Sequence, residues 1–317
     1  MKLKPRTLYK WYRDIISYYH QDVASGKFAS NKVYEFNSET GEIHKEQIVH
    51  IVKPENVGES MCIDEKMISK RYSTIISNQQ TGKIALLIDS IKPSLVKQSI
   101  ELLGKENLEK IEFINSDMSP VMKKICNDTI SNAAIVIDKF HVIKHIMDAL
   151  NTVRLELKQK SKQSKEPSTI NPNGWTDVEL LEKSRYLLYK MWNMLEQEEK
   201  NILEAVFKKH PVLHQAYNLV QQIRNWYDKK NVGSPPLKIE NELDHWLTKA
   251  RQSKIKAFRV IAKMFENHRD DILRYFQKGL TNAKAENLNS KIQRFVTSNY
   301  GTRDKHFFFY RTQIYFS

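Results

Sequence analysis

Three acidic residues, Asp64, Asp117 and Glu286, have the chemistry and the positions of metal ligands. Asp64 ends a short apolar run, Asp117 follows another, and Glu286 lies in a late segment with helical periodicity. Cleavage of a phosphodiester needs a nucleophilic oxygen at neutral pH and neutralisation of charge on the leaving oxygen, and two magnesium ions about 3.5 to 4 Å apart can provide both. Magnesium prefers carboxylate oxygens, whereas zinc favours Cys and His. The residue types therefore favour two magnesium ions, for which manganese can substitute.

The charge of the chain indicates an anionic partner. Its 317 residues include 51 Lys and Arg against 37 Asp and Glu, which gives a net charge of +14 and a pI near 9.5. Residues 249–311 contain 15 basic side chains and only 5 acidic ones. Such a concentration favours binding to phosphates, because neutralising them releases condensed counterions.

Composition excludes several classes of protein. Hydrophobic residues make up 40% of the chain, enough for a core, and the length predicts about two domains. No segment approaches the roughly 18 apolar residues that cross a bilayer, and the N-terminus lacks the apolar stretch of a signal peptide, so we expect a soluble, cytoplasmic protein. Cys62 and Cys126 are the only cysteines, which excludes a disulfide framework and a Cys-rich zinc module.

The pattern of apolar residues predicts an alternation of strands and helices followed by helices alone. Apolar runs bounded by turn residues indicate strands at 61–64, 72–77, 83–89, 111–115 and 134–137. Helices are predicted at 93–104 and 119–130, the second because Ser119 can cap free amides and Pro120 has no amide hydrogen to lose. From Phe140 to about residue 279 the periodicity is helical throughout.

This order of elements is that of a ribonuclease-H-like α/β fold. Three antiparallel strands and two strands from crossover units form a mixed five-stranded sheet with flanking helices, in which the first and fourth strands are neighbours about 4.8 Å apart. Asp64 and Asp117 follow those two strands, so we expect their side chains to converge. Glu286 would come from a helix packed over the sheet edge, on the face that also carries Asn282 and Asn289, away from the apolar stripe.

Asp138 is a rival for the second carboxylate of the site. It follows the fifth strand, one position farther from Asp64 than Asp117 is, and a metal pair is bridged more easily from adjacent strands. We therefore expect Asp138 to cap the helix that follows it.

Four motifs follow one another along the chain: CIDE at 62–65, INSDMSP at 114–120, VIDKFHVIK at 136–144 and AENLNSKI at 285–292. In this order they resemble the ISL-three family of bacterial insertion-sequence transposases, and the resemblance runs from about Ser60 to the C-terminus. It implies a ribonuclease-H-like catalytic domain with a large all-helical insertion, in which Asp64, Asp117 and Glu286 bind the metal ions.

The resemblance implies a DNA transposase that cuts at the ends of an insertion sequence and joins the new 3′-hydroxyl to target DNA. Its partners would be double-stranded DNA and a second copy of the chain on paired ends, in the bacterial cytoplasm at the nucleoid and without a membrane. Two alternatives remain: a nuclease of the same fold that does not join strands, and a non-catalytic DNA-binding protein derived from a transposase.

Three regions follow from this interpretation. Residues 1–58 form an N-terminal appendage with a helix at 7–21, residues 59–140 and 275–317 form the catalytic domain, and residues 141–274 form the helical insertion. Family members usually begin with a Cys-rich zinc segment and a helix-turn-helix. Their counterparts are not recognisable here, so recognition of the DNA ends is expected from residues 1–58 or from a separate polypeptide, unless the element is incomplete.

Basic and polar residues near two of the motifs are candidates for contact with DNA. His141 and His145 could instead bind zinc from one helical turn together with Asp138. The aromatic residues Trp175, Trp192, Trp226 and Trp246 and the run 306–310 are expected to pack in the interior rather than stack on bases. The DNA-binding candidates are Lys139, His141, Lys144, Lys284, Asn287, Lys291 and Arg294.

Overall fold

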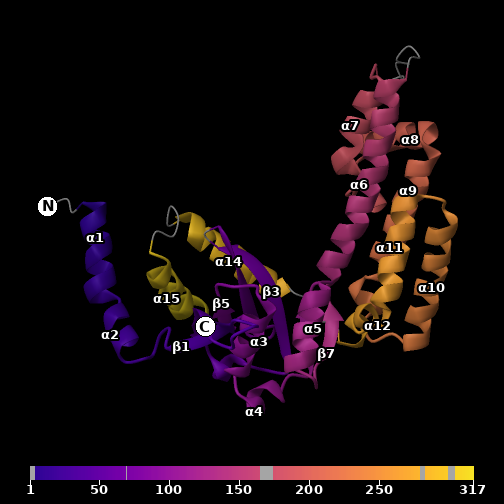
Figure 1. Cartoon of the computed structure of the whole chain (residues 1–317). Helices are drawn as coiled ribbons and strands as arrows, with labels where there is room; N and C mark the ends of the chain where they lie inside the picture. Colours follow the sequence, from indigo (N-terminus) through magenta and orange to yellow (C-terminus); the bar gives the residue numbers. More distant parts are fainter. Residues whose placement is uncertain (1–3, 69, 165–173, 279–282, 299–303) are drawn as a thin grey trace. The chain divides into compact units, whose positions relative to one another are not determined.

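The chain forms two compact units, residues 1–136 with 281–317 and residues 137–280. The computed structural model describes residues 4–68, 70–164, 174–278, 283–298 and 304–317, and of residues 278 and 283–286 only the backbone. Figure 1 shows strands and helices mixed in the first unit and helices in the second.

The first unit is an α/β structure built on a seven-stranded mixed sheet with the order β1-β2-β5-β4-β3-β6-β7. The first three neighbouring pairs and the pair β3–β4 are antiparallel, whereas β3 and β6 run parallel. The strands are β1 Asn31–Phe36, β2 Ile43–Val52, β3 Ser60–Ile68, β4 Arg71–Asn78, β5 Ile84–Ile88, β6 Phe113–Ser116 and β7 Ala134–Ile137. The predicted antiparallel meander is confirmed by β3, β4 and β5. The prediction that the first and fourth of the five expected strands are neighbours is confirmed by the pairing of β3 with β6.

The prediction of five strands was wrong, because β1 and β2 extend the sheet. Both come from residues 1–58, which we expected to form an appendage. β2 pairs with β5 through Val49 and Ile88, and β1 pairs with β2 at the sheet edge. The residues of β1 are mostly half-buried and those of the first part of β2 are exposed, so these strands lack the clean apolar alternation by which a strand is recognised in sequence.

Helices cover both faces of the sheet and bury a separate apolar core on each. One face packs against α3 Pro93–Glu101 and α5 Pro120–Thr129 through residues such as Ile63, Ile100 and Ile125. The other packs against α14 Ala283–Ser298 and α15 Lys305–Phe316. Ser119 caps α5 by accepting a hydrogen bond from the amide of Met122 at 3.3 Å, as predicted. The short helix α4 Lys105–Leu108 precedes β6.

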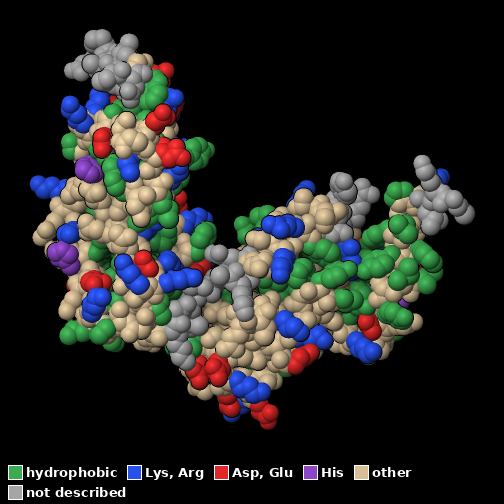
Figure 2. Space-filling view, turned by 180° about the vertical axis from the view of Figure 1, so that it is seen from behind, with side chains coloured by type: hydrophobic (Ala, Val, Ile, Leu, Met, Phe, Trp, Pro, Cys, Tyr) green, Lys and Arg blue, Asp and Glu red, His purple; other side chains and the backbone are tan. Residues whose placement is uncertain are grey.

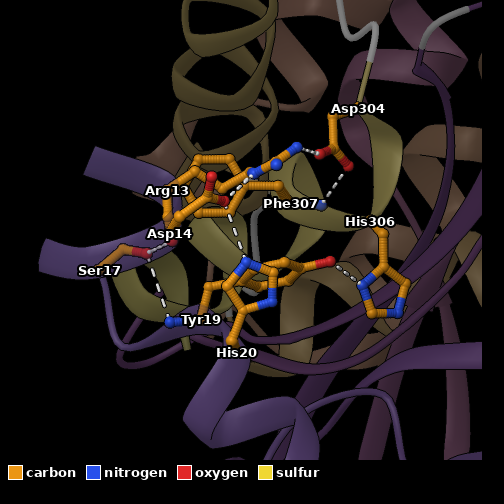
Figure 3. A network of polar contacts seen from close by, with 8 residues as sticks. All are labelled: Arg13, Asp14, Ser17, Tyr19, His20, Asp304, His306 and Phe307. Atoms are coloured by element: carbon orange, nitrogen blue, oxygen red, sulfur yellow. Dashed lines mark hydrogen bonds and ion pairs between the residues drawn. The ribbon is translucent and has the colours of Figure 1, made fainter. Parts of the chain in front are cut away.

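The N-terminal helical segment is fastened to α15 by polar and aromatic contacts (Figure 3). It consists of α1 Pro5–Trp11, a π-helical turn at Tyr12–Ile16 and α2 Tyr19–Ala24. Arg13 forms an ion pair with Asp304 at 2.9 Å, and the hydroxyl of Tyr19 lies 2.6 Å from Nδ1 of His306. The aromatic run 306–310 is buried, apart from a half-buried His306, so its predicted packing role is confirmed. Figure 2 shows hydrophobic side chains gathered over the N-terminal helices.

The second unit is helical throughout its described residues, as predicted. Trp226 and Trp246 are buried in its interior, whereas Trp192 and Trp175 are partly exposed, with Lys183 over the ring of Trp175. None of the helices described has the length and apolar character needed to span a bilayer. The helices are α6 Lys139–Gln163, α7 Asp177–Leu187, α8 Gln197–Lys209, α9 Pro211–Trp226, α10 Pro236–Gln252, α11 Lys256–Asn267, α12 Arg269–Leu273 and α13 Tyr275–Lys278, with short 3-10 turns at Pro54–Asn56 in the first unit and at Trp192–Met194 and Lys229–Asn231 in the second.

His50 makes the stability of the first unit depend on pH. Its imidazole is buried against the ring of Phe309, and burial, with smaller contributions from His306 and Lys305, lowers its pKa to about 3. The unfolded chain takes up this proton below about pH 6.5 and the folded chain does so only near pH 3. The free energy of unfolding should therefore fall as the pH decreases through this window, by at most about 1.4 kcal/mol per pH unit.

Replacement of His50 with Leu should make this decline shallower, because Leu keeps the apolar packing and carries no titrating group. Urea-induced unfolding measured between pH 7 and pH 4 for both proteins tests the prediction. An identical pH dependence in the variant would show that His50 is not responsible.

Candidate functional site

Asp64 and Asp117 lie at the same level of two neighbouring strands. The parallel pairing of β3 with β6 ends at Cys62 and Asn115, and each aspartate lies two residues farther along its segment, Asp64 within β3 and Asp117 just after the end of β6. Asp64 does not end its strand as we expected. β3 continues to Ile68 in its pairing with β4, because the β3–β4 hairpin extends beyond the end of β6.

A hydrogen bond between side chains joins Asp64 to α14. The amide nitrogen Nδ2 of Asn289 donates to Oδ2 of Asp64 at 2.5 Å, and the other oxygen, Oδ1, accepts a hydrogen bond from the backbone amide of Glu65 at 2.8 Å. Strand alternation places Asp64 on the same sheet face as Ile68, which is the face that α14 covers. The two carboxylate oxygens of Asp64 are therefore held from two different elements.

Asp117 is held by the turn that leads into α5. Its Oδ1 accepts a hydrogen bond from the backbone amide of Ser119 at 2.9 Å. Burial raises the pKa of the Cys126 thiol to about 12, and the nearby carboxylate of Asp117 adds to the effect.

Glu65 connects the two aspartates electrostatically. Partial burial raises the pKa of its carboxyl group, and repulsion by Asp117 and then by Asp64 raises it further. Among the described residues, Asp64, Glu65 and Asp117 are not part of a group of three His, Cys, Asp or Glu side chains that could hold a metal ion.

The side chain of Asn115, in β6 two residues before Asp117, is fully buried. Neither polar atom of its side chain has a hydrogen-bond partner among the described residues, and the same is true of the hydroxyl of Ser116. Buried polar groups are rarely left unsatisfied, because each costs about 1 to 3 kcal/mol. Water or a bound polar group would relieve this cost. The sequence analysis did not identify Asn115, although a polar residue within the apolar run IEFIN was a signal.

The third predicted carboxylate cannot be placed, because the side chains of Glu286 and Lys284 lie outside the described residues. The helix predicted around them is α14, and its stripe of Leu288, Ile292, Phe295 and Val296 packs on the sheet as expected. Asn289, noticed only as a neighbour of Glu286 on the helix face, contacts Asp64. The other candidates on this helix, Asn287, Lys291 and Arg294, are exposed.

Asp138 belongs to the second unit and caps α6, as predicted. It is buried, and its Oδ1 accepts a hydrogen bond from the backbone amide of Phe140 at 3.2 Å. Its Oδ2 lies 3.1 Å from Nδ1 of His141. His145 and Lys144 are exposed. Within the described part of the chain no three His, Cys, Asp or Glu side chains form a metal-binding group, so the alternative zinc site gains no support.

Lys139 is directed to the interior of the second unit rather than left free for DNA. Its ammonium group donates a hydrogen bond to the backbone oxygen of Tyr227 and lies 5.7 and 5.6 Å from the ring centres of Tyr227 and Tyr275. Burial lowers the pKa of Lys139. Lys139 was a candidate for DNA contact because it lies in the third motif, but its position beside two buried tyrosines favours a packing role.

Comparison with known proteins identifies the family. The profile of the ISL-three transposases matches residues 61–312. The transposase of insertion sequence IS1557 of Mycobacterium tuberculosis is 22% identical over 74% of this chain and 54% of its own length. The transposase of IS1001 of Bordetella parapertussis is 21% identical over 81% of this chain and 61% of its own length. The chain thus spans little more than half the length of these relatives. No solved structure gives a significant match.

The capping role of Asp138 predicts different effects for two substitutions. Asp138→Ala should lower the free energy of unfolding by about 0.5 to 2 kcal/mol, because α6 loses its cap, whereas Asp138→Asn should retain most of the stability, since Asn caps helices about as well as Asp. Thermal denaturation followed by circular dichroism compares the variants. Equal destabilisation by Ala and Asn would contradict a role in capping.

Proposed function

Because the chain belongs to the ISL-three family of transposases, we propose that it cuts DNA at the ends of an insertion sequence and joins the ends to target DNA. The observation that carries this proposal is the parallel register of β3 with β6, which places Asp64 and Asp117 two residues beyond the paired residues Cys62 and Asn115. A helix from the C-terminal segment reaches the same carboxylates through Asn289.

The residues at this place fit magnesium. Carboxylates and amide oxygens are the ligands that this ion prefers, and the unpartnered side chain of Asn115 offers a further polar group beside them. We propose that Asp64, Asp117 and Glu286 hold two magnesium ions, with manganese as a substitute. When bound, such ions make water a stronger acid and neutralise charge on a leaving oxygen.

The chain's own residues would prepare the site for this chemistry. Asn289 holds one oxygen of Asp64 in place, and the amide of Ser119 does the same for Asp117. Both contacts limit the rotation of carboxylates that would otherwise repel each other. The exposed Lys291 and Arg294, on the helix that carries Asn289, are suited to bind phosphates of the DNA.

The catalytic domain that we expect at residues 59–140 and 275–317 would correspond to most of the first unit, and the helical insertion expected at residues 141–274 to the second unit. The strand order β5-β4-β3-β6-β7 supports this assignment. By analogy with the family, the protein would act as a dimer on paired double-stranded DNA ends. Residues 1–58 or another polypeptide would contribute to recognition of those ends.

Substitution of either central aspartate tests the catalytic proposal. Asp64→Asn and Asp117→Asn should each abolish magnesium-dependent nicking of supercoiled DNA, because a neutral amide holds a divalent cation far less strongly than a carboxylate. Asp128→Asn serves as a matched control, since Asp128 lies on the surface of the same unit in an ion pair with Lys97. Nicking and thermal stability should be measured with magnesium and with manganese.

Three outcomes would overturn parts of this proposal. If Asp117→Asn still cuts DNA and a well-folded Asp138→Asn does not, the second carboxylate is Asp138. If nicking occurs but no joined products form, the protein is a nuclease without strand transfer. A protein that binds DNA and never cuts it under these conditions is a non-catalytic derivative.

The exposed cations of α14 predict a change in the salt dependence of DNA binding. Replacing Lys291 and Arg294 with Ala should make the slope of log K against log salt shallower by about 0.9 for each phosphate that the protein no longer neutralises. Replacement of the exposed Lys105 and Lys110, which lie at α4, gives a control with the same reduction in charge. An unchanged slope in the α14 variant would place the DNA elsewhere.

A further inference from the structure

The second unit contains a polar groove between α9 and α10. Its volume is about 500 Å³, within the usual range of ligand sites, roughly 300 to 1,000 Å³. None of the residues that line it carries a carboxylate, although the unit as a whole contains many acidic side chains. The polar side chains of the lining are His214, Gln215, Asn218, Gln222, Lys249 and Gln252, together with Ser253.

The face that α9 presents to this groove is unusual for a helix surface. Gln215, Asn218, Gln222 and Asn225 follow one another at spacings of three and four residues, so they share one side of the helix, and all are exposed. Exposed helical positions are usually occupied by charged residues, Lys, Glu, Arg and Asp above all. Carboxamides both donate and accept hydrogen bonds, which matches the edges of nucleobases.

An aromatic wall lies beside the amides. The exposed imidazole of His214 stacks on the buried ring of Phe207, with 4.5 Å between ring centres and 12° between planes. Phe207 thus covers one face of the imidazole and holds it in place. The other face is available to a planar group such as a base.

A cation completes the groove on the side of α10. Nζ of Lys249 lies 3.4 Å from Oε1 of Gln222, so it spans from one helix to the other. Its charge would meet a phosphate, and no carboxylate of the lining opposes it.

We propose that this groove binds an unpaired segment of DNA, with a base stacked on His214, its edge bonded to the amides of α9 and its phosphate near Lys249. This inference rests on the proposed function, because cutting and joining DNA ends exposes unpaired nucleotides. A groove of this volume is too small for a duplex, and the Watson–Crick edge of a base is open to hydrogen bonds only when the base is unpaired.

Binding of a short fluorescein-labelled single strand to the full chain, followed by anisotropy, tests the proposal. The triple variant Gln215→Ala, Asn218→Ala, Gln222→Ala should bind the single strand at least about tenfold more weakly and a duplex of the same sequence as before, since each good amide contact to a base is worth about tenfold or more. The double variant Gln197→Ala, Asn201→Ala removes two exposed amides of α8 outside the groove and should change neither affinity.

Stacking on His214 has its own readout. A 2-aminopurine placed in the single strand should lose fluorescence on binding to the native protein, and His214→Ala should reduce both this quenching and the affinity, the latter about tenfold. Competition with free deoxynucleoside monophosphates distinguishes a strand from a mononucleotide as the ligand. Displacement of the strand by monophosphates at comparable concentration would overturn the assignment to a DNA segment.

The outcomes separate this inference from the proposed function. The proposal that the groove binds single-stranded DNA is overturned if the triple variant binds the single strand as before, or if its affinities for single strand and duplex fall equally. This holds even if nicking depends on Asp64. If the triple variant loses single-strand binding, the proposed role of the groove is supported. If nicking at the same time does not depend on Asp64, the catalytic proposal is contradicted. Circular dichroism of each variant excludes misfolding as the cause.

Discussion

The parallel pairing of β3 with β6 is the constraint on which the candidate site depends. It joins Cys62 to Asn115 across about fifty residues of sequence, and it thereby sets Asp64 and Asp117 at one level. Because side chains alternate between sheet faces, a slip of one residue in this register would turn Asp64 away from α14. The backbone hydrogen bonds between β3 and β6 thus decide whether the two carboxylates can act together.

Apolar packing brings the C-terminal segment to the same place. Leu288 and Ile292 bury one side of α14 on the sheet, and the aromatic residues of α15 fill the adjoining core. Asn289 is carried to Asp64 by this packing, since it lies next to the buried stripe on the same helix. The second unit lies between β7 and α14 in the sequence. The helix α14 therefore packs on a sheet whose strands precede it by more than a hundred residues.

The candidate site contains groups whose arrangement reduces stability. Glu65 has a raised pKa because it is partly buried and close to Asp117 and Asp64, and the amide of Asn115 is buried without a partner. Neither arrangement favours folding by itself. Uncompensated groups of this kind are common at functional sites of proteins.

The sequence alone determined the elements with strong local signals. Ser119 and Asp138 predicted helix starts through their capping chemistry, and the apolar runs predicted the five strands that carry the motifs. Tertiary structure decided what depends on distant partners. β1 and β2 join the sheet although their exposed residues lack alternation, and Lys139 binds within the second unit because Tyr227 and Tyr275 lie beside it. The contact of Asn289 with Asp64 likewise depends on a register and a packing face, which no local pattern encodes because both are set by residues far away in the chain.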